Sequence, residues 1–317
     1  MPTLEMKHLV SCLLVLASVA TLNAAEKPSE SKAKADQGDI GAEAPAGKPY
    51  IDKTSGGKPR QMEIYFPPAS VFAQDGFTSL FNGKDLTGWD GDPKLWKVED
   101  GVVIGTCSGP DALANNSFLI WRGGKVADFE LRATVRVVGD NNSGLQYRSR
   151  ELPEVAPWVI AGYQCDIHPA LEHTGMTYEE KGRGIFGLNG RSVLLDPEGA
   201  LWLLSEHAPV KVDVSQWNEY TIIARGNQLI HKINDQVTSE LIDHHEKGRA
   251  LEGLLAIQLH RGNANSVHIK DLRLKTLTDG KVSAFDAAQL PAGATKIEKP
   301  RTTRPQGTGP VVAPVKK

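Results

Sequence analysis

Three short segments of the chain carry amide, carboxylate, guanidinium and imidazole side chains at alternate positions, with apolar residues between them. The polar members are Asn142, Gln146 and Arg148 in the first segment, Gln164, Asp166 and His168 in the second, and Gln258 and His260 in the third. Because successive side chains of a β-strand point to opposite faces, each segment predicts a strand with one polar face. If the three strands are neighbours, their polar rows form one patch.

Such a patch has two interpretations. Amides, a guanidinium, a carboxylate and an imidazole can together satisfy many sugar hydroxyls, and Asp166 with His260 can also transfer protons. The simpler alternative is a hydrated sheet face without a ligand. The alternation by itself does not choose between them.

A fourth segment, 178–185, places two carboxylates beside an arginine. Glu179 and Glu180 precede Arg183, which lies between two glycines where a backbone can bend over a ligand. Paired carboxylates can divide the roles of acid and base if their surroundings separate their pKa values. A solvated run of charges fits the same spacing. The sequence therefore leaves open which of these carboxylates, with Asp166, does what.

The histidines of this region leave open a divalent metal ion. His168 and His173 lie close in sequence to Asp166 and Glu172, and such side chains bind hard and borderline cations. Their spacing matches no strong metal motif. The metal ligands are therefore unknown at this level, and no other cofactor is expected.

The elements that must position these residues are short strands. They are predicted at 96–98, 102–104, 129–137, 142–148, 163–168, 217–224, 229–233, 237–242, 254–260 and 267–274. Asp100-Gly101 and Asn234-Asp235 predict hairpin turns, and a change of parity near Asp271 predicts a bulge. About ten short strands without a convincing long helix predict an all-β fold, a two-sheet antiparallel jelly-roll sandwich, with a closed barrel as the alternative.

Both ends of the chain differ in composition from this central region. Residues 1–25 combine Lys7, an apolar run and small residues up to Ala25, which is the layout of a secretory signal peptide. Residues 26–74 and 278–317 have little apolar periodicity, so we predict a disordered linker and a disordered tail. One folded domain is therefore predicted over 75–277, in a bacterial protein exported to the periplasm or the exterior.

Composition also argues against two classes of partner. The 36 basic and 38 acidic residues give a net charge of −2, and no dense basic patch occurs, so nucleic acid is not expected. After the predicted signal peptide no segment has the ~20 apolar residues that a membrane-spanning helix needs. Cys107 and Cys165 are the cysteines that remain, and we expect two buried free thiols.

Several motifs resemble those of one known family in residue type and in order. They lie at 77–89, 96–102, 128–131, 142–144, 162–164, 217–220, 225–227 and 269–274. Over about residues 75 to 276 the chain resembles the 3-keto-disaccharide hydrolase domain family. The resemblance implies a fold similar to concanavalin A-like lectins and glucanases. Many members read Gly-Tyr-Glu-x-Gln where this chain reads Gly162-Tyr163-Gln164-Cys165-Asp166, so its acid and amide are exchanged.

The resemblance implies cleavage of glycosides that already carry a ketone at C3, by hydrolysis or by elimination followed by hydration. The ketone acidifies the C2 proton, so that a base can remove it while the C1 oxygen leaves. An upstream glycoside 3-oxidase would supply such a substrate. The alternative is a non-catalytic, lectin-like carbohydrate-binding module.

On this hypothesis the acids and the imidazole receive catalytic roles. Asp166 or Glu179 would be the base, and His260 or Glu180 would protonate the leaving oxygen. The sequence does not choose within either pair.

The cations and amides would stabilise and bind the sugar. Arg148 or Arg183 would stabilise the developing enolate. The residues expected to bind substrate are Asn142, Gln146, Arg148, Gln164, His168 and Gln258.

Overall fold

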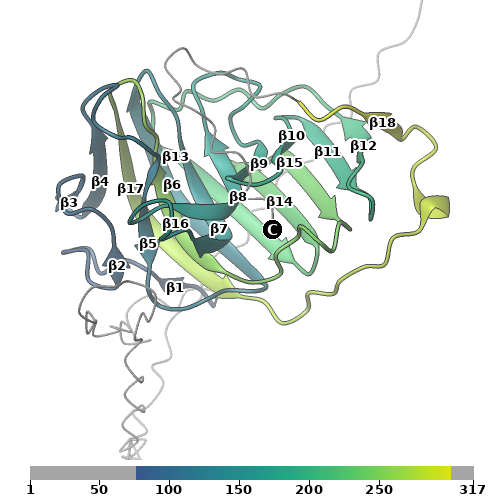
Figure 1. The fold of residues 1–317 in the computed structure, drawn as a ribbon, viewed down its shortest axis with the longest axis horizontal. Helices are drawn as coiled ribbons and strands as arrows, with labels where there is room; N and C mark the ends of the chain where they lie inside the picture. Colours follow the sequence, from purple (N-terminus) through teal and green to yellow (C-terminus); the bar gives the residue numbers. More distant parts are fainter. Residues whose placement is uncertain (1–75, 301–317) are drawn as a thin grey trace, which may run out of the picture. The chain divides into compact units, whose positions relative to one another are not determined.

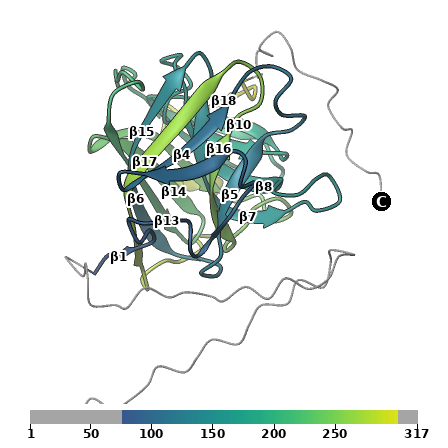
Figure 2. The same ribbon diagram turned by 90° about the vertical axis from the view of Figure 1, so that its left-hand side faces the viewer.

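Two β-sheets packed face to face form the folded part of the chain. The computed structural model describes residues 76–300 (Figures 1 and 2). The smaller sheet has seven strands in the order β10 (Gly184–Gly187), β9 (Thr177–Glu180), β8 (Ile160–Ile167), β7 (Ser143–Glu151), β16 (Leu254–Leu259), β5 (Ser117–Trp121) and β2 (Trp89–Asp90). Its neighbouring strands all run antiparallel.

The larger sheet has eleven strands. Their order is β18 (Thr295–Ile297), β12 (Leu201–Glu206), β11 (Arg191–Leu195), β15 (Gln236–Asp243), β14 (Gln228–Ile233), β13 (Asn218–Arg225), β6 (Phe129–Gly139), β17 (Asn265–Thr276), β4 (Val102–Cys107) and β3 (Trp96–Glu99), with β1 (Thr78–Ser79) beside β17. The pair β11 and β15 is parallel, which differs from the predicted antiparallel pattern. The prediction of an all-β, two-sheet sandwich is confirmed.

The predicted turns and bulge are present. Asp100 and Gly101 both have positive φ between β3 and β4, as do Asn234 and Asp235 between β14 and β15. Positive φ at both central residues is the requirement of the two-residue hairpin turn whose twist matches that of the strands. Asp271 also has positive φ, at the register break of β17 against β6.

The core lies between the sheets and follows from alternation along the strands. In β6 every second residue is buried. The seven-stranded sheet contributes Leu145, Tyr147, Tyr163, Cys165, Ile167, Ile257 and Leu259 to the same cluster. Each fully buried aliphatic side chain contributes about 1.5–3 kcal/mol. Residues of opposite parity in β7, β8 and β16 must therefore lie on the outer face of the seven-stranded sheet.

Buried hydrogen bonds between side chains connect the two sheets. The hydroxyl of Tyr147 lies 2.8 Å from Nε2 of His231 on β14, and Tyr163 donates its hydroxyl proton to Asp243 on β15 at 2.5 Å. The hydroxyls of Thr177 and Ser239 are 2.8 Å apart. Hydrogen bonds have strong distance and angle requirements, so these pairs fix how one sheet sits on the other.

Arg148 forms a further connection at one end of the sandwich. Its guanidinium donates to the backbone oxygens of Ala127 at 2.9 Å and Gly226 at 2.6 Å, and it pairs with Asp128 at 3.1 Å. These partners belong to the larger sheet or adjoin it, whereas Arg148 belongs to β7. A buried guanidinium needs such partners to offset its lost hydration.

The predicted disordered tail is wrong for residues 278–300. The segment Thr295–Ile297 pairs with Leu201–Leu203 as β18, and the ring of Phe285 packs on that of His244 at 5.5 Å. The apolar side chains of this stretch are too widely spaced to show a period, and it is tertiary contacts such as those of Phe285 and Ile297 that hold the segment. The predicted signal peptide and linker lie outside the described residues.

Two further expectations concern thiols and membranes. Cys107 and Cys165 are both buried and free, as predicted. Within residues 76–300 no helix has the length and apolar character that crossing a bilayer demands.

Substitution of Arg148 tests the connection that it makes between the sheets. We expect Arg148→Met to lower the free energy of unfolding by about 2–4 kcal/mol, because it leaves buried acceptors unpaired. The matched control is Arg150→Met, which changes an exposed residue of the same strand and should cost less than about 0.5 kcal/mol. Urea unfolding measures both, and equal costs would contradict the assigned role.

Candidate functional site

The three predicted polar rows lie in one sheet. Strands β8, β7 and β16 are consecutive neighbours, as the hypothesis of a single patch required. Gln146 pairs with Gln164, and Gly144 lies between Asp166 on one side and Gln258 on the other. These four polar side chains therefore share the outer face, and each is no more than 2 % exposed. We call the set Asn142, Gln146, Gln164, Asp166, Glu180 and Gln258 the polar face.

Two glycines allow neighbouring side chains to pack closely against the backbone of the polar face. A Cβ on Gly144 would lie 2.4 Å from Cδ of Gln164, and one on Gly162 would lie 2.3 Å from Oγ of Ser149. Both distances are far below van der Waals contact. Gly144 thus makes room for the amide of Gln164.

A chain of hydrogen-bonding groups runs along β7 and β8. Oγ of Ser149 is 2.9 Å from the amide of Gln146, which in turn is 2.9 Å from the amide of Gln164. The amide of Gln164 is hydrogen-bonded to Oδ1 of Asp166, whose Oδ2 accepts from Nδ2 of Asn142 at 3.4 Å. The carboxyl group of Asp166 therefore terminates a continuous buried network.

Glu180 reaches the same face from β9. Its Oε2 accepts hydrogen bonds from Nδ2 of Asn116 and from Nε2 of Gln258, both at 3.2 Å. Gln258 lies on β16, which β8 and β7 separate from β9 in the sheet. Because these side chains meet across two intervening strands, this face of the sheet must be concave.

The two carboxyl groups of the polar face have raised pKa values. Burial raises the pKa of Asp166 to about 7, with a smaller contribution from the charge of Glu180, against hydrogen bonding with Gln164 and Asn142. Burial also raises the pKa of Glu180 to about 7, against the charge of Lys181 and a hydrogen bond from Asn116. Carboxyl groups with such pKa values can exchange protons near neutral pH, as a general acid or base must.

Two of the predicted histidines are neutral near pH 7. Burial lowers the pKa of both His168 and His260 to about 4, and electrostatic repulsion from His173 and then from His260 adds to the effect on His168. Nδ1 of His260 lies 2.5 Å from the backbone oxygen of Arg261, which can only accept, so Nδ1 carries the proton and Nε2 is bare. This arrangement makes His260 a hydrogen-bond acceptor and does not favour the predicted role as proton donor.

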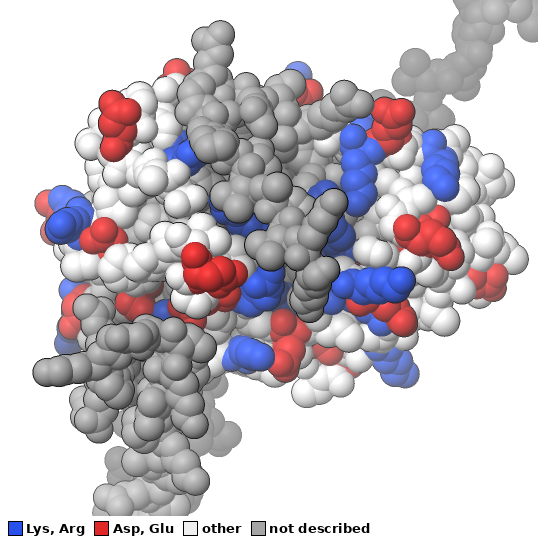
Figure 3. All heavy atoms as spheres, in the orientation of Figure 1, with Lys and Arg blue, Asp and Glu red and all other residues white. Residues whose placement is uncertain are grey.

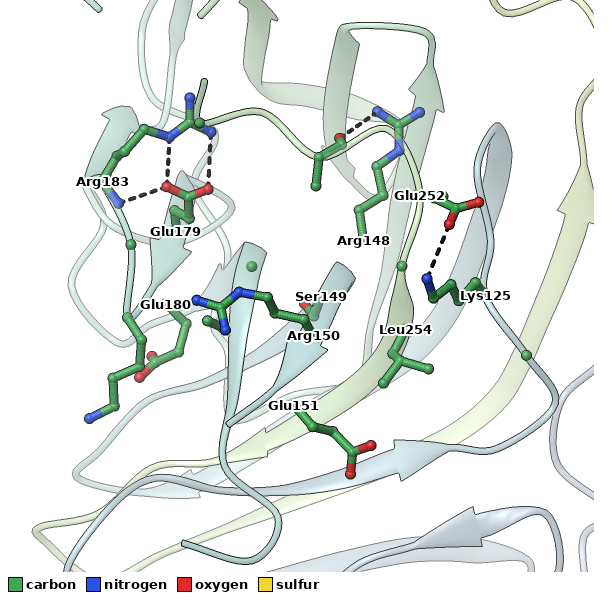
Figure 4. A pocket seen from close by; sticks show the side chains of 18 of the residues that line it. Lys125, Arg148, Ser149, Arg150, Glu151, Glu179, Glu180, Arg183, Glu252 and Leu254 are labelled. Carbon is green, nitrogen blue, oxygen red and sulfur yellow. Dashed lines mark hydrogen bonds and ion pairs between the residues drawn. The ribbon is translucent and has the colours of Figure 1, made fainter. Parts of the chain in front are cut away.

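Glu179 and Arg183 belong to a different cluster. Neighbouring residues of a strand point to opposite faces, and Glu179 pairs with the core residue Tyr163 whereas Glu180 pairs with Gly162. Arg183 donates through Nε to Glu179 at 2.7 Å and also pairs with Asp243 at 2.8 Å. Figure 4 shows Glu179 held by Arg183 while Glu180 points away from that pair.

Arg148 is also separate from the polar face, although its parity in the sequence matched that of Gln146. The register of β7 against β8 breaks between Tyr147 and Arg150, and Arg148 has positive φ. This bulge shifts the alternation, so that the guanidinium turns to the backbone oxygens described above. Arg148 and Arg183 therefore both have structural partners in place of the predicted enolate.

Sequence reasoning missed three polar residues of this region. Asn116 precedes β5 and binds Glu180, Ser149 ends the amide chain, and Tyr178 pairs with Gln164 on the same face. The pKa of Tyr178 is raised by burial and then by the nearby carboxylates Glu180 and Asp166, which keeps its hydroxyl protonated. Tyr178 had a findable signal, because it has the same parity as Glu180.

A cavity of about 820 Å³ adjoins the polar face. Its lining includes Ser149, Gly162 and Glu180, so it begins where the amide chain ends (Figure 4). Arg150, Lys125 and Glu252 lie around it, and acidic and basic side chains are interspersed over the visible surface (Figure 3). Ligand sites typically have volumes of this size.

The arrangement of the described side chains bears on the divalent metal ion that the sequence left open. Among residues 76–300 no group of three or more His, Cys, Asp and Glu side chains is arranged to hold an ion. His168 and His173 have ring centroids 5.0 Å apart, and Nε2 of His173 lies 3.2 Å from Glu172.

Solved structures with a similar fold include carbohydrate-active proteins. A provisionally named glycosyl hydrolase from Parabacteroides distasonis is 22% identical, with a TM-score of 0.44 over 64% of this chain and 94% of its own. The carbohydrate-binding module CBM66 from Bacillus subtilis is 14% identical, with a TM-score of 0.41 over 60% and 96%. The Bacillus licheniformis β-glucanase is 8% identical, with a TM-score of 0.39 over 63% and 97%.

The sequence comparisons identify a family. No curated protein matches the chain significantly. The model of the 3-keto-alpha-glucoside-1,2-lyase-like domain matches residues 76–275, which is nearly the whole described sandwich and more than half of the chain. With its two-sheet fold and the predicted resemblance over the same residues, this protein belongs to the 3-keto-alpha-glucoside-1,2-lyase-like domain family.

Proposed function

We propose that the protein cleaves 3-keto-glycosides at the polar face by elimination across C1 and C2. The observation that carries the proposal is the presence of two buried carboxyl groups, Asp166 and Glu180, on one concave face with pKa values of about 7. Membership of a lyase-like family supports this choice of reaction. Neither carboxyl group has an arginine or lysine among its side-chain hydrogen-bond partners in the described region, so both are free to exchange protons.

The reaction needs one ionised and one protonated carboxyl group. The ionised group removes the proton from C2, which the neighbouring C3 ketone acidifies, and the electrons form a C1–C2 double bond. The C1–O bond breaks, and the protonated group gives its proton to the departing oxygen. The products are an unsaturated 3-keto sugar and a free alcohol, and later addition of water to the double bond completes net hydrolysis.

Other groups of the face suit the rest of the sugar. The protonated hydroxyl of Tyr178 can donate a hydrogen bond to the ketone oxygen as negative charge develops there. Oε1 of Gln258 is buried without a hydrogen-bond partner among the described residues, so it can accept from a sugar hydroxyl. The adjoining cavity can hold the second sugar.

The biological setting is also part of the proposal. The signal-peptide pattern of residues 1–25 supports export from a bacterial cell. A ketone at C3 must be made before cleavage, so an enzyme that oxidises glycosides at C3 should act first. Carbohydrate binding without turnover is the competing function, because the same buried amides would also hold an unreactive sugar.

The direct test is an assay on a 3-keto-disaccharide such as 3-keto-trehalose. We expect release of free glucose together with near-ultraviolet absorbance from the conjugated product. Unoxidised trehalose is the matched control and should stay intact, because its C2 proton is not acidic. A parallel reaction with chelator shows whether cleavage needs a divalent ion. Binding of the keto sugar without release of glucose would establish the competing function instead.

Removal of either carboxyl group tests its part in proton transfer. We expect Asp166→Asn and Glu180→Gln each to lower kcat by about 10²–10⁴-fold, the usual contribution of a general acid or base. Glu99→Gln, on the exposed edge strand β3, should retain full activity. Steady-state kinetics on folded variants gives the answer, and near-normal kcat in both site variants would refute the mechanism.

The pH dependence of the reaction follows from the raised pKa values. The base acts only above its pKa and the acid only below its own, so kcat/KM should fall on both sides of an optimum close to pH 7. The apparent pKa values of the two limbs belong to the pair of carboxyl groups and not to either residue alone, because the two groups interact. An optimum near pH 4 to 5 with no alkaline limb would mean that buried carboxyl groups do not carry the reaction.

A further inference from the structure

The buried amide of Gln146 has one end surrounded by oxygen atoms. That end lies 2.8 Å from the backbone oxygen of Tyr163, 3.3 Å from that of Gly162 and 2.9 Å from Oγ of Ser149. Its other end lies 2.9 Å from the amide of Gln164. Gln146 is fully buried and Gln164 almost so, so water cannot supply a missing partner.

The backbone oxygens determine which way the Gln146 amide points. A carbonyl oxygen can accept a hydrogen bond but cannot donate one, so the end facing Tyr163 and Gly162 must be the NH₂ group. One of its protons goes to Tyr163 and the other to Oγ of Ser149, whose own proton can go to the backbone oxygen of Tyr147 at 3.1 Å. The opposite orientation would hold two buried carbonyl oxygens together at 2.8 Å.

The orientation of the Gln146 amide fixes that of the Gln164 amide. With its NH₂ group directed at Tyr163, Gln146 presents its oxygen to Gln164, which must then donate from its own NH₂ group. The oxygen of Gln164 is consequently directed at Oδ1 of Asp166. Two oxygen atoms form a hydrogen bond only if one of them carries a proton.

We propose that the Gln146–Gln164 amide pair holds Asp166 in its protonated form, with the proton on Oδ1 directed at the oxygen of Gln164. Oδ2 is then the carbonyl-like oxygen of the acid and accepts from Nδ2 of Asn142, as observed at 3.4 Å. Every member of the network has a partner in this arrangement. The burial of Asp166 favours the same neutral form.

Glu180 has the opposite surroundings. Its Oε2 receives two NH₂ donors, from Asn116 and Gln258, which stabilise an ionised carboxylate. Resting on the proposed function, the inference assigns Asp166 as the acid that protonates the departing oxygen and Glu180 as the base that removes the C2 proton. Gln146 and Gln164 are positioning residues, since they act through Asp166.

The test is a titration of the Asp166 carboxyl carbon by ¹³C NMR in the full chain, without substrate. The signal is identified by its loss in Asp166→Asn. In the wild type we expect Asp166 to remain protonated well above the ordinary aspartate range. In Gln146→Met the backbone oxygens no longer dictate the direction of Gln164, whose NH₂ group can turn to the carboxylate, and the pKa of Asp166 should fall by about one unit or more.

A matched control separates this effect from loss of a neighbouring polar group. Ser149→Ala removes one acceptor of Gln146 but leaves the oxygen of Tyr163 in place, so the amide keeps its direction and the pKa of Asp166 should shift much less. An ordinary aspartate pKa in the wild type would overturn the proposal. An equal pKa in wild type and Gln146→Met would do so as well.

A measurement on Asp166→Asn covers the case in which Gln146→Met does not fold. An asparagine has NH₂ where the protonated acid has O–H, so it fits the proposed network and the Tm should not fall. Asp166→Leu should lower the Tm, and equal losses in both variants would overturn the proposal. Neither titration nor Tm involves turnover, so these results are independent of whether a 3-keto-glycoside is cleaved.

Discussion

The stacked pair of Tyr147 and Tyr163 is the interaction on which the arrangement of the site depends. Their ring centroids are 5.6 Å apart, and their hydroxyls hydrogen-bond to His231 and Asp243 of the opposite sheet. Because they are direct cross-strand partners, they fix the register of β7 against β8. A slip by one residue would exchange the two faces of a strand, so the same register places the next pair, Gln146 and Gln164, together on the outer face.

The buried carboxyl groups on the two faces of the seven-stranded sheet have different partners. Glu179, on the tyrosine side, is neutralised by Arg183 through bonds at 2.6 to 3.0 Å, which is a structural ion pair. Glu180, one residue later, receives only neutral side-chain donors and keeps a raised pKa. Burying a carboxyl group without a cation costs stability. Asp166 and Glu180 are both buried in this way on one face. Their raised pKa values are those expected of groups that exchange protons.

Much of the fold and part of the site follow from local rules that the sequence displays. Alternation identified β6 to β8 and β16, and therefore the residues of the polar rows. It failed at Arg148, because a bulge changes parity without a clear sequence signal. It was not applied to Glu179 and Glu180, because segment 178–185 was not expected to form a strand; pairing in β9 places the two carboxylates on opposite faces. The contact of Asn116 with Glu180 could not be predicted from the sequence, because it depends on the curvature of the sheet. The strand β18 depends on a tertiary partner and has no period of its own.

The direction of the amide chain gives a physical meaning to the exchange of acid and amide at positions 164 and 166. The oxygen of Gln146 is directed along the chain because the backbone oxygen of Tyr163 takes its NH₂ group. An acid at position 164 would meet that oxygen directly and would have to be protonated. With an amide at position 164, the residue that must be protonated is instead Asp166, the next member of the chain. The backbone oxygen of Tyr163 thus determines that the chain ends in a proton, and the side chain at position 164 determines which residue carries it.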